Sequence, residues 1–140
     1  MAGFNKFDCA VGDIGLKLHQ LNTDTLKVYL TNATPVVGNT VYNTPADLAT
    51  SGGYTAGGQD VTNTWTQAGG LWTLAIGADL VWTGSGAGFG PFRYAVLYND
   101  TPSTPGVDPL IGYWDYGSSI TLNDTETFTV DFGASMFTIA

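Results

Sequence analysis

The segment Glu126-Thr127-Phe128-Thr129-Val130-Asp131-Phe132 decides the fold class. Its apolar side chains, Phe128, Val130 and Phe132, alternate with threonines and an aspartate. Successive side chains of a β-strand point to opposite faces of the sheet, so this alternation is typical of a strand with one dry and one wet face. The segment therefore predicts an antiparallel strand that places its three apolar side chains in the core.

Three further segments repeat this alternation. In the first segment, Leu26, Val28 and Leu30 share one face, opposite Lys27, Tyr29 and Thr31. In the second, Trp72, Leu74 and Ile76 share one face. In the third, one face carries Phe92, Tyr94, Val96 and Tyr98, opposite Arg93, Ala95 and Leu97. In each case the first group is expected to face the core. The many threonines between them suit solvent-facing strand positions.

Glycine-rich turns separate the predicted strands. Gly69-Gly70, between Trp65 and Trp72, is expected to close a hairpin because glycine adopts positive φ at little cost. Short strands at such intervals are typical of a sandwich or a jelly roll. The sequence predicts an all-β fold, a β-sandwich or jelly roll of about eight or nine antiparallel strands, near 25–32, 59–66, 71–76, 79–83, 91–98, 109–116, 118–122, 126–132 and 135–139.

The N-terminal part of the chain follows a different period. Its apolar residues recur three or four positions apart, which is typical of one helix face: Phe4, Phe7, Val11, Ile14, Leu18 and Leu21. We predict a helix over about 5–19, although Gly12 and Gly15 each disfavour it by roughly 1 kcal/mol relative to alanine. The length of 140 residues fits one domain, with an N-terminal helical arm (1–22) followed by a β-sandwich (23–140).

Composition and charge exclude several classes of function. Four basic residues face twelve acidic ones, for a net charge of −8. Binding to nucleic acid or to an anionic membrane needs a cationic surface that this chain cannot assemble. The N-terminus has no apolar core typical of a signal peptide, and no apolar stretch reaches the length of a membrane span, so we expect synthesis in a cytoplasm.

The sequence contains no pattern typical of a catalytic site. His19, the only histidine, is expected at the surface or edge of the predicted helix, and no serine occupies a nucleophile elbow. Cys9 is expected to be a small buried residue. Glu126 is the only glutamate, and Asp115 shares its predicted strand face with apolar groups, so we expect a structural carboxylate there. We therefore predict that the chain is not an enzyme and that it has no catalytic residue and no cofactor.

A metal site is also not expected. Calcium prefers several oxygen ligands, and an acidic chain offers many of them. However, Asp100 and Asp108 form only a loose pair, and no calcium-binding loop pattern occurs. We therefore predict no metal-binding residues.

The tryptophans leave an alternative open. Trp72, Trp82 and Trp114 share strand faces with apolar residues, so we expect these three to be buried. A carbohydrate-binding module stays a second interpretation. In that case Trp65, with Tyr29 and Tyr113, would stack on sugar rings.

Four strings carry a resemblance to a known family. They are Asp24-Thr25-Leu26-Lys27-Val28-Tyr29-Leu30-Thr31-Asn32, Gly53-Tyr54-Thr55-Ala56-Gly57-Gly58, Gly90-Pro91-Phe92-Arg93-Tyr94-Ala95-Val96-Leu97-Tyr98-Asn99-Asp100-Thr101 and Pro109-Leu110-Ile111-Gly112-Tyr113-Trp114-Asp115-Tyr116-Gly117. In this order, over most of the chain, they resemble small virion proteins of tailed bacteriophages. Such proteins are similar to capsid decoration, or cement, proteins. The resemblance carries no catalytic residue.

The resemblance implies a virion structural protein on the outside of the head. Its partners would be the major capsid protein and further copies of itself, as a homotrimer, and it would be made in the host cytoplasm. A tail, collar or fibre component is an alternative of the same class.

The long connections 33–58 and 99–109, together with the N-terminal arm, are the predicted contact segments. Loops of this length in a small domain are usually functional. Within them we predict four residues of a protein interface: Tyr54, Pro102, Pro105 and Val107.

Overall fold

The computed structural model describes residues 2–42, 46–102 and 107–140. These residues form ten β-strands and one short helix. In chain order they are β1 (Phe4–Lys6), α1 (Cys9–Gly15), β2 (Leu26–Thr31), β3 (Gln59–Asp60), β4 (Asn63–Ala68), β5 (Leu71–Ile76), β6 (Leu80–Thr83), β7 (Phe89–Asn99), β8 (Leu110–Leu122), β9 (Thr127–Val130) and β10 (Phe137–Ile139). No helix in these ranges has the length and apolarity that crossing a membrane requires.

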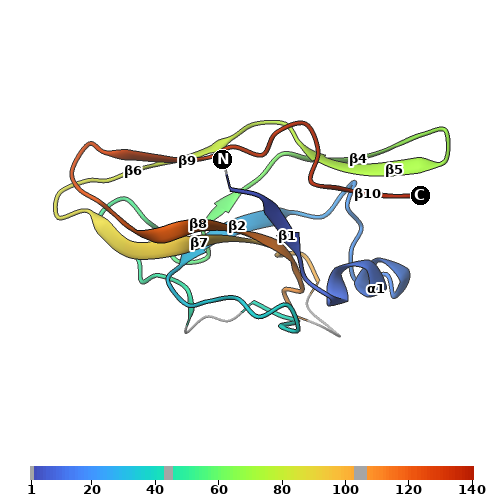
Figure 1. Cartoon of the computed structure of the whole chain (residues 1–140), viewed down its shortest axis with the longest axis horizontal. Coiled ribbons are helices and arrows are strands. Elements are labelled where there is room, and N and C mark those ends of the chain that lie inside the picture. Colours follow the sequence, from blue (N-terminus) through green and yellow to red (C-terminus); the bar gives the residue numbers. More distant parts are fainter. Residues whose placement is uncertain (1, 43–45, 103–106) are drawn as a thin grey trace.

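The strands form two layers, which confirms the predicted all-β sandwich (Figure 1). One layer is a five-stranded sheet in the order β1-β8-β7-β2-β3. The other contains a three-stranded sheet, β10-β5-β4, and a two-stranded sheet, β6-β9. All neighbouring strands pair antiparallel. A jelly-roll arrangement stays a prediction.

Apolar side chains from both layers form an inner core between them. Phe128 and Val130 are buried in it while Thr127 and Thr129 are exposed, as the alternation predicted. Phe132 is buried too, just beyond the end of β9. Burying a large apolar side chain contributes about 1.5–3 kcal/mol, so this core supplies much of the stability.

The far face of the five-stranded sheet carries a second, outer core. Five buried residues form it: Phe7, Tyr29, Val96, Tyr98 and Leu110. The expectation that Tyr29 and Thr31 face solvent is therefore wrong, because the chain after β2 turns back and runs across this face (Figure 1). A period of two describes a strand correctly but does not show whether its second face is covered.

An irregular register in β7 corrects a second expectation. Phe92 lies in the inner core with Ala95 and Leu97, whereas Val96 and Tyr98 lie in the outer core. The pairing of β7 with β8 shifts between Phe92 and Tyr94, which is the effect of a β-bulge. Phe92 thus faces the inner core as predicted, but Val96 and Tyr98, which were expected on the same face, lie on the outer one. Ala95 and Leu97, expected opposite Phe92, share its face instead.

The N-terminal segment contains a strand of the five-stranded sheet as well as a helix. The predicted helix is present as α1 but covers only Cys9–Gly15, so its predicted extent of 5–19 is wrong, and residues 4–6 pair with β8 as β1. The ring of Phe4 lies over Gly112, where a Cβ atom would come within 2.1 Å of it, so glycine at this position makes room for β1. The helix ends before Lys17, whose φ of 63° does not continue an α-helix.

His19 departs from its expected surface position. It follows α1, is 5% exposed, and its Nδ1 lies 3.2 Å from Nδ2 of Asn99 at the end of β7. The same Asn99 nitrogen donates to Asp24 Oδ2 at 2.6 Å, so a buried amide joins segment 19–24 to the sheet. Burial lowers the pKa of His19, and the nearby carboxylates of Asp13 and Asp24 oppose this change.

Several strand boundaries also differ from the prediction. The expected strand 59–66 is two strands in different sheets, β3 and β4, because the chain crosses between the layers after Asp60. The expected strands 109–116 and 118–122 are one continuous strand, β8. The hairpin at Gly69-Gly70 is confirmed, with both glycines at positive φ.

The tryptophans divide into buried and exposed members. Trp82 and Trp114 are buried as predicted, but Trp72 is 41% exposed, so its predicted burial is wrong. Trp72 lies near the free end of the β4–β5 hairpin, which projects at one end of the molecule (Figure 1). Its ring stacks on that of Trp65, with 5.5 Å between the ring centroids.

Candidate functional site

The three predicted contact segments meet at one side of the molecule. The chain around Thr40–Tyr42 lies beside Asp108–Leu110, since Tyr42 N donates to Asp108 O at 2.8 Å and Leu110 N donates to Thr40 O at 3.0 Å. Just before α1, Asp8 N donates to Val37 O at 3.0 Å. Backbone hydrogen bonds therefore join residues of the two long connections and of the N-terminal segment.

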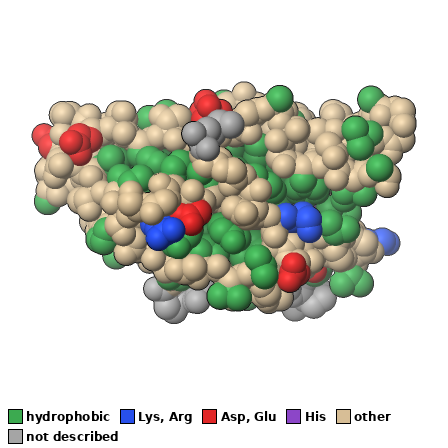
Figure 2. Space-filling view, in the orientation of Figure 1, with side chains coloured by type: hydrophobic (Ala, Val, Ile, Leu, Met, Phe, Trp, Pro, Cys, Tyr) green, Lys and Arg blue, Asp and Glu red, His purple; other side chains and the backbone are tan. Residues whose placement is uncertain are grey.

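Exposed valines gather on these joined segments. Val36, Val37 and Val41 precede the first gap in the described chain, and Val107 follows the second; Val36 is 60% and Val107 54% exposed. We refer to these four residues as the valine surface. The chain after β2 runs along the lower side of the molecule in Figure 1, and Figure 2 shows hydrophobic side chains at that edge. Exposed apolar groups of this kind are typical of a contact surface.

The predicted interface residues have different positions. Tyr54 is 1% exposed, so its expected position on a contact surface is wrong for the single chain. Val107 is exposed and Pro102 half-buried, and their contact with a partner stays a prediction. Pro105 lies outside the described residues.

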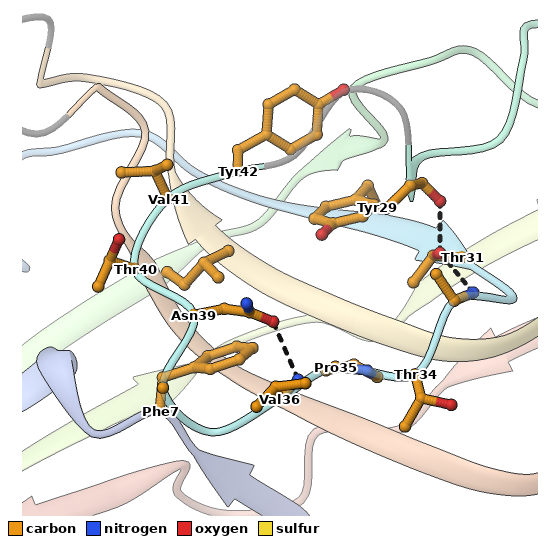
Figure 3. A pocket seen from close by; sticks show the side chains of 14 residues that line it. Phe7, Tyr29, Thr31, Thr34, Pro35, Val36, Asn39, Thr40, Val41 and Tyr42 are labelled. Carbon is orange, nitrogen blue, oxygen red and sulfur yellow. Dashed lines mark hydrogen bonds between the residues drawn. The ribbon is translucent and has the colours of Figure 1, made fainter.

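A pocket of about 510 Å³ lies between segment 33–42 and the outer face of the five-stranded sheet (Figure 3). Phe7, Tyr29 and Leu110 contribute apolar surface from the sheet side, and Val36 and Val41 contribute it from the covering segment. The fourteen residues that line the pocket include no Asp, Glu, Lys, Arg or His. The pocket therefore suits an uncharged ligand.

A group of hydrogen bonds to Asp47 holds this covering part of the chain in place. The hydroxyl groups of Tyr42 and Tyr54 donate to the Asp47 carboxylate, and Gly57 N donates to it at 2.5 Å. Tyr54 Oη also accepts from Leu30 N of β2 at 3.0 Å. Because Asp47 and Tyr54 connect the loop directly to a central strand, the loop is fixed to the sheet.

Two further hydroxyl groups fix the ends of the covering segment. Thr31 Oγ1 donates to Ala46 O and accepts from Ala33 N at 3.0 Å. Thr34 Oγ1 and the hydroxyl of Tyr94 lie 3.1 Å apart. The pocket walls are therefore held by the protein's own hydrogen bonds, which favours a pre-formed site.

The tyrosines among the described residues of the pocket lining are not suited to proton transfer at neutral pH. Burial, with a smaller contribution from the Asp47 charge, raises the pKa of Tyr29 to about 12. Burial and the hydrogen bond to Asp47 raise the pKa of Tyr42 well above its ordinary value. Both tyrosines are therefore neutral hydroxyl groups, and the lining is suited to binding.

Cys9 lies at the edge of the same region and is half-buried rather than fully buried. Its Sγ lies 3.5 Å from Leu110 O and 3.7 Å from Asn39 O. Burial, followed by the charge of Asp13, raises the pKa of the thiol to about 11. At neutral pH the group is a protonated donor to backbone carbonyl groups and not a nucleophile.

Two of the carboxylates singled out in the sequence, Asp100 and Asp115, form ion pairs. Asp115 accepts from Arg93 Nε at 2.7 Å and from Arg93 Nη2 at 3.0 Å. Asp100 lies 3.5 Å from Lys27 Nζ. Burial and the Asp100 charge raise the pKa of Asp108. Within the described ranges, no three His, Cys, Asp or Glu residues are placed to share a metal ion.

The sugar-stacking arrangement that the sequence suggested is not formed. The ring of Tyr29 is buried in the outer core, and Tyr113 packs against Phe7 with 5.2 Å between the ring centroids. Trp65 stacks on Trp72 instead of standing alone.

Nothing in the sequence indicated the roles of Asp47 and Asn39. Both residues lie in a stretch without periodicity, where only long-range contacts define what a side chain does.

No protein family, curated protein or solved structure matches this chain. The valine surface and the adjoining pocket are the two features of this region that are suited to binding. Both are made by loops that a rigid sandwich positions, which is where binding residues of β-proteins commonly lie.

Proposed function

We propose that this chain is a structural protein of a bacteriophage virion, a decoration or cement protein that binds the outside of the head and stabilises it by bridging capsomers. Its partners are the major capsid protein and, within a homotrimer, further copies of itself. The observation that carries the proposal is the valine surface, which two neighbouring loops build on one side of the sandwich.

The chemistry of this surface suits contact with another protein. Valine side chains lose little conformational entropy when they are buried, because branching at Cβ already restricts them. An apolar contact area also avoids the removal of water from charged groups, which is a large cost of association. The hydrogen bonds of Asp47 hold the loop before a partner arrives, so less ordering remains to be done on binding.

A lattice of capsomers multiplies contacts that are weak individually. Each copy that bridges two capsomers makes its second contact at high effective concentration. A ligand that binds only the assembled shell stabilises that shell against disassembly. The net charge of −8 would meanwhile keep decorated particles apart.

Binding to expanded capsids that lack the protein tests this proposal. We expect saturable binding and a higher temperature of head disruption. The double variant Val36→Asp/Val107→Asp should weaken binding about tenfold or more, because two carboxylates would lose water against an apolar partner.

Val81→Asp is the matched control. Val81 is an exposed valine on β6, in the opposite layer, so this variant should bind capsids as the unmodified chain does. Equal loss in both variants would mean that added charge, and not the valine surface, determines binding. Imaging of labelled chain in intact particles adds a direct check, since a location in the tail, collar or fibres would contradict the decoration role.

A carbohydrate-binding module is a second candidate, and the exposed ring of Trp72 favours it. Stacked on Trp65, that ring offers an aromatic surface at the end of an uncharged hairpin. Oligosaccharides that bind there should quench tryptophan fluorescence, and Trp72→Ala should abolish the effect. Unchanged fluorescence across a panel of neutral glycans would remove this candidate.

A further inference from the structure

We propose that the pocket under segment 33–42 binds one apolar side chain of an extended peptide segment, together with the peptide group beside it. This inference rests on the proposed function in one respect: the segment would belong to the capsid protein. The binding chemistry itself follows from two polar groups and the apolar walls of the pocket.

The first polar group is the hydroxyl of Tyr29. Tyr29 is only 4% exposed and lines the pocket. Its hydroxyl points into the pocket (Figure 3). The other tyrosines around it have partners, since Tyr42 and Tyr54 donate to Asp47 and Tyr98 donates to Gly57 O at 2.8 Å. The Tyr29 hydroxyl has no hydrogen-bond partner within the described residues. The hydroxyl borders the pocket and is not an enclosed unpaired atom, which among the described residues is His19 Nε2, so a ligand in the pocket can reach it.

The second polar group is the side-chain amide of Asn39. Its Oδ1 accepts from Val36 N at 2.9 Å, which orients the side chain (Figure 3). Its Nδ2 has no partner in the described part of the chain and is therefore free to donate. An amide that only donates and a hydroxyl that donates or accepts together match the carbonyl oxygen and the N–H of a peptide group.

The walls determine the rest of the ligand. Phe7 and Leu110 on the sheet side, with Val36 and Val41 on the covering segment, present apolar surface, and the lining carries no charge. Val36 and Val41 belong to both the pocket and the valine surface, so a segment that lies across this surface reaches the pocket directly. A volume of about 510 Å³ is ample for one side chain with its peptide group.

The apolar rim favours a peptide over a sugar. Sugar hydroxyl groups would have to leave water against the exposed valines at the rim, whereas an apolar side chain would gain from the same contact. A charged ligand is disfavoured because no lining residue carries the opposite charge.

NMR titration of the full chain with N-acetyl-leucine N-methylamide tests this site without any capsid. This probe has one apolar side chain between two peptide groups. We expect saturable shifts at millimolar probe in the backbone amide signals of Val36, Thr40 and Leu110. Methyl glucoside at the same concentrations should leave these signals unchanged. No shift with the amide probe, or shifts with the sugar alone, would overturn the proposal.

Two tyrosine variants provide a matched pair. Tyr29→Phe removes a hydroxyl with no described protein partner, so it should weaken probe binding about three- to tenfold and leave thermal stability nearly unchanged. Tyr98→Phe removes a hydroxyl that bonds Gly57 O outside the pocket lining, so it should lower stability and leave probe affinity unchanged. Equal probe affinity in Tyr29→Phe and the unmodified chain would contradict the assigned role of Tyr29.

A pocket-filling variant guards against a failure of Tyr29→Phe to fold. Ala33 lines the pocket, and Ala33→Trp should abolish the probe shifts. Retained probe binding in this variant would contradict the site.

Capsid binding then separates the two proposals. Probe binding without capsid binding would reject the decoration role and keep the pocket assignment. Capsid binding without probe binding would reject the pocket and keep the decoration role.

Discussion

The two faces of the five-stranded sheet are covered in different ways. On the inner face, strands of the second layer supply the covering side chains, and the core is almost entirely apolar. On the outer face, an irregular segment covers a core that includes Tyr29 and Tyr98. Hydroxyl–carboxylate hydrogen bonds attach this segment, one from Tyr42 and one from Tyr54, whose ring lies in the inner core. The inner face thus depends on packing of regular strands, whereas the outer face depends on a few polar attachments.

This difference affects which face can accept substitutions that create a binding site. Strand-on-strand packing leaves little freedom to change one residue without disturbing its neighbours. A loop that is held at a few points can vary between those points and still stay in place. The pocket and three of the four residues of the valine surface lie in such a loop, so the face that is less regular is the one available for binding.

The largest expected effect tests the inner core. Trp82 is fully buried and packs against Phe128, so Trp82→Ala should destabilise the protein by about 3–5 kcal/mol through loss of buried surface and a residual cavity. Urea unfolding followed by circular dichroism measures this change. Trp72→Ala, at an exposed ring, should cost about 1 kcal/mol or less. A similar loss of unfolding free energy in the two variants would contradict the assignment of Trp82 to the inner core.

The next effect tests the outer face. Asp47→Ala removes the acceptor for two tyrosine hydroxyl groups and Gly57 N, and should cost about 2–3 kcal/mol, because hydrogen bonds to a charged group are stronger than average. The loss should be local. Hydrogen exchange should become faster at Gly57 and Leu30 while amides of β6 and β9 keep their protection. Faster exchange throughout the chain would mean that the outer face is not a separate unit.

A third effect depends on pH and tests the junction at the end of the sheet. Because burial lowers the pKa of His19, the unfolded chain binds a proton more readily than the folded chain. Stability from this group should be complete above about pH 6.5 and should fall as the pH drops toward the folded pKa, by at most about 1.4 kcal/mol per pH unit.

Chemical denaturation between pH 7.5 and pH 5 measures this dependence. His19 is the only histidine, so His19→Gln should remove the slope in this range and leave the carboxylate effects at lower pH. The same slope in the variant would show that another group titrates.

The smallest effect refines the comparison within the outer core. Tyr98→Phe removes one hydrogen bond, to Gly57 O, and should cost about 1 kcal/mol, less than Asp47→Ala. Thermal unfolding of the two variants and of the double variant measures whether the effects are coupled. Simple addition would indicate that Asp47 and Tyr98 hold the loop independently.

The sequence predicted the inner face better than the outer one for a physical reason. The alternation of Phe128 with threonines, and of Leu26, Val28 and Leu30 with more polar residues, reflects local geometry that any strand shares. Coverage of Tyr29 and Thr31 depends instead on a contact with residues farther along the chain, which no local period records.

The same reason explains the errors at the N-terminus and in the candidate site. Phe4 and Phe7 fit a helical period, yet pairing with β8 and burial beside Leu110 determine their positions. The predicted contact segments do lie side by side, but Tyr54 is an internal attachment of the loop. Asp47, which holds that loop, resembles any other loop aspartate until its partners are known.

The position of Cys9 allows its reactivity to be used as a probe of segment 33–42. Its thiol lies under the backbone carbonyl of Asn39 and beside that of Leu110, and the chain has no other cysteine. Alkylating reagents attack the thiolate, so a protonated and half-covered sulfur should be labelled slowly while the covering segment is seated. The rate of alkylation at Cys9 Sγ therefore measures how often segment 33–42 opens locally. This rate should fall when a ligand bound in the pocket stabilises the closed segment.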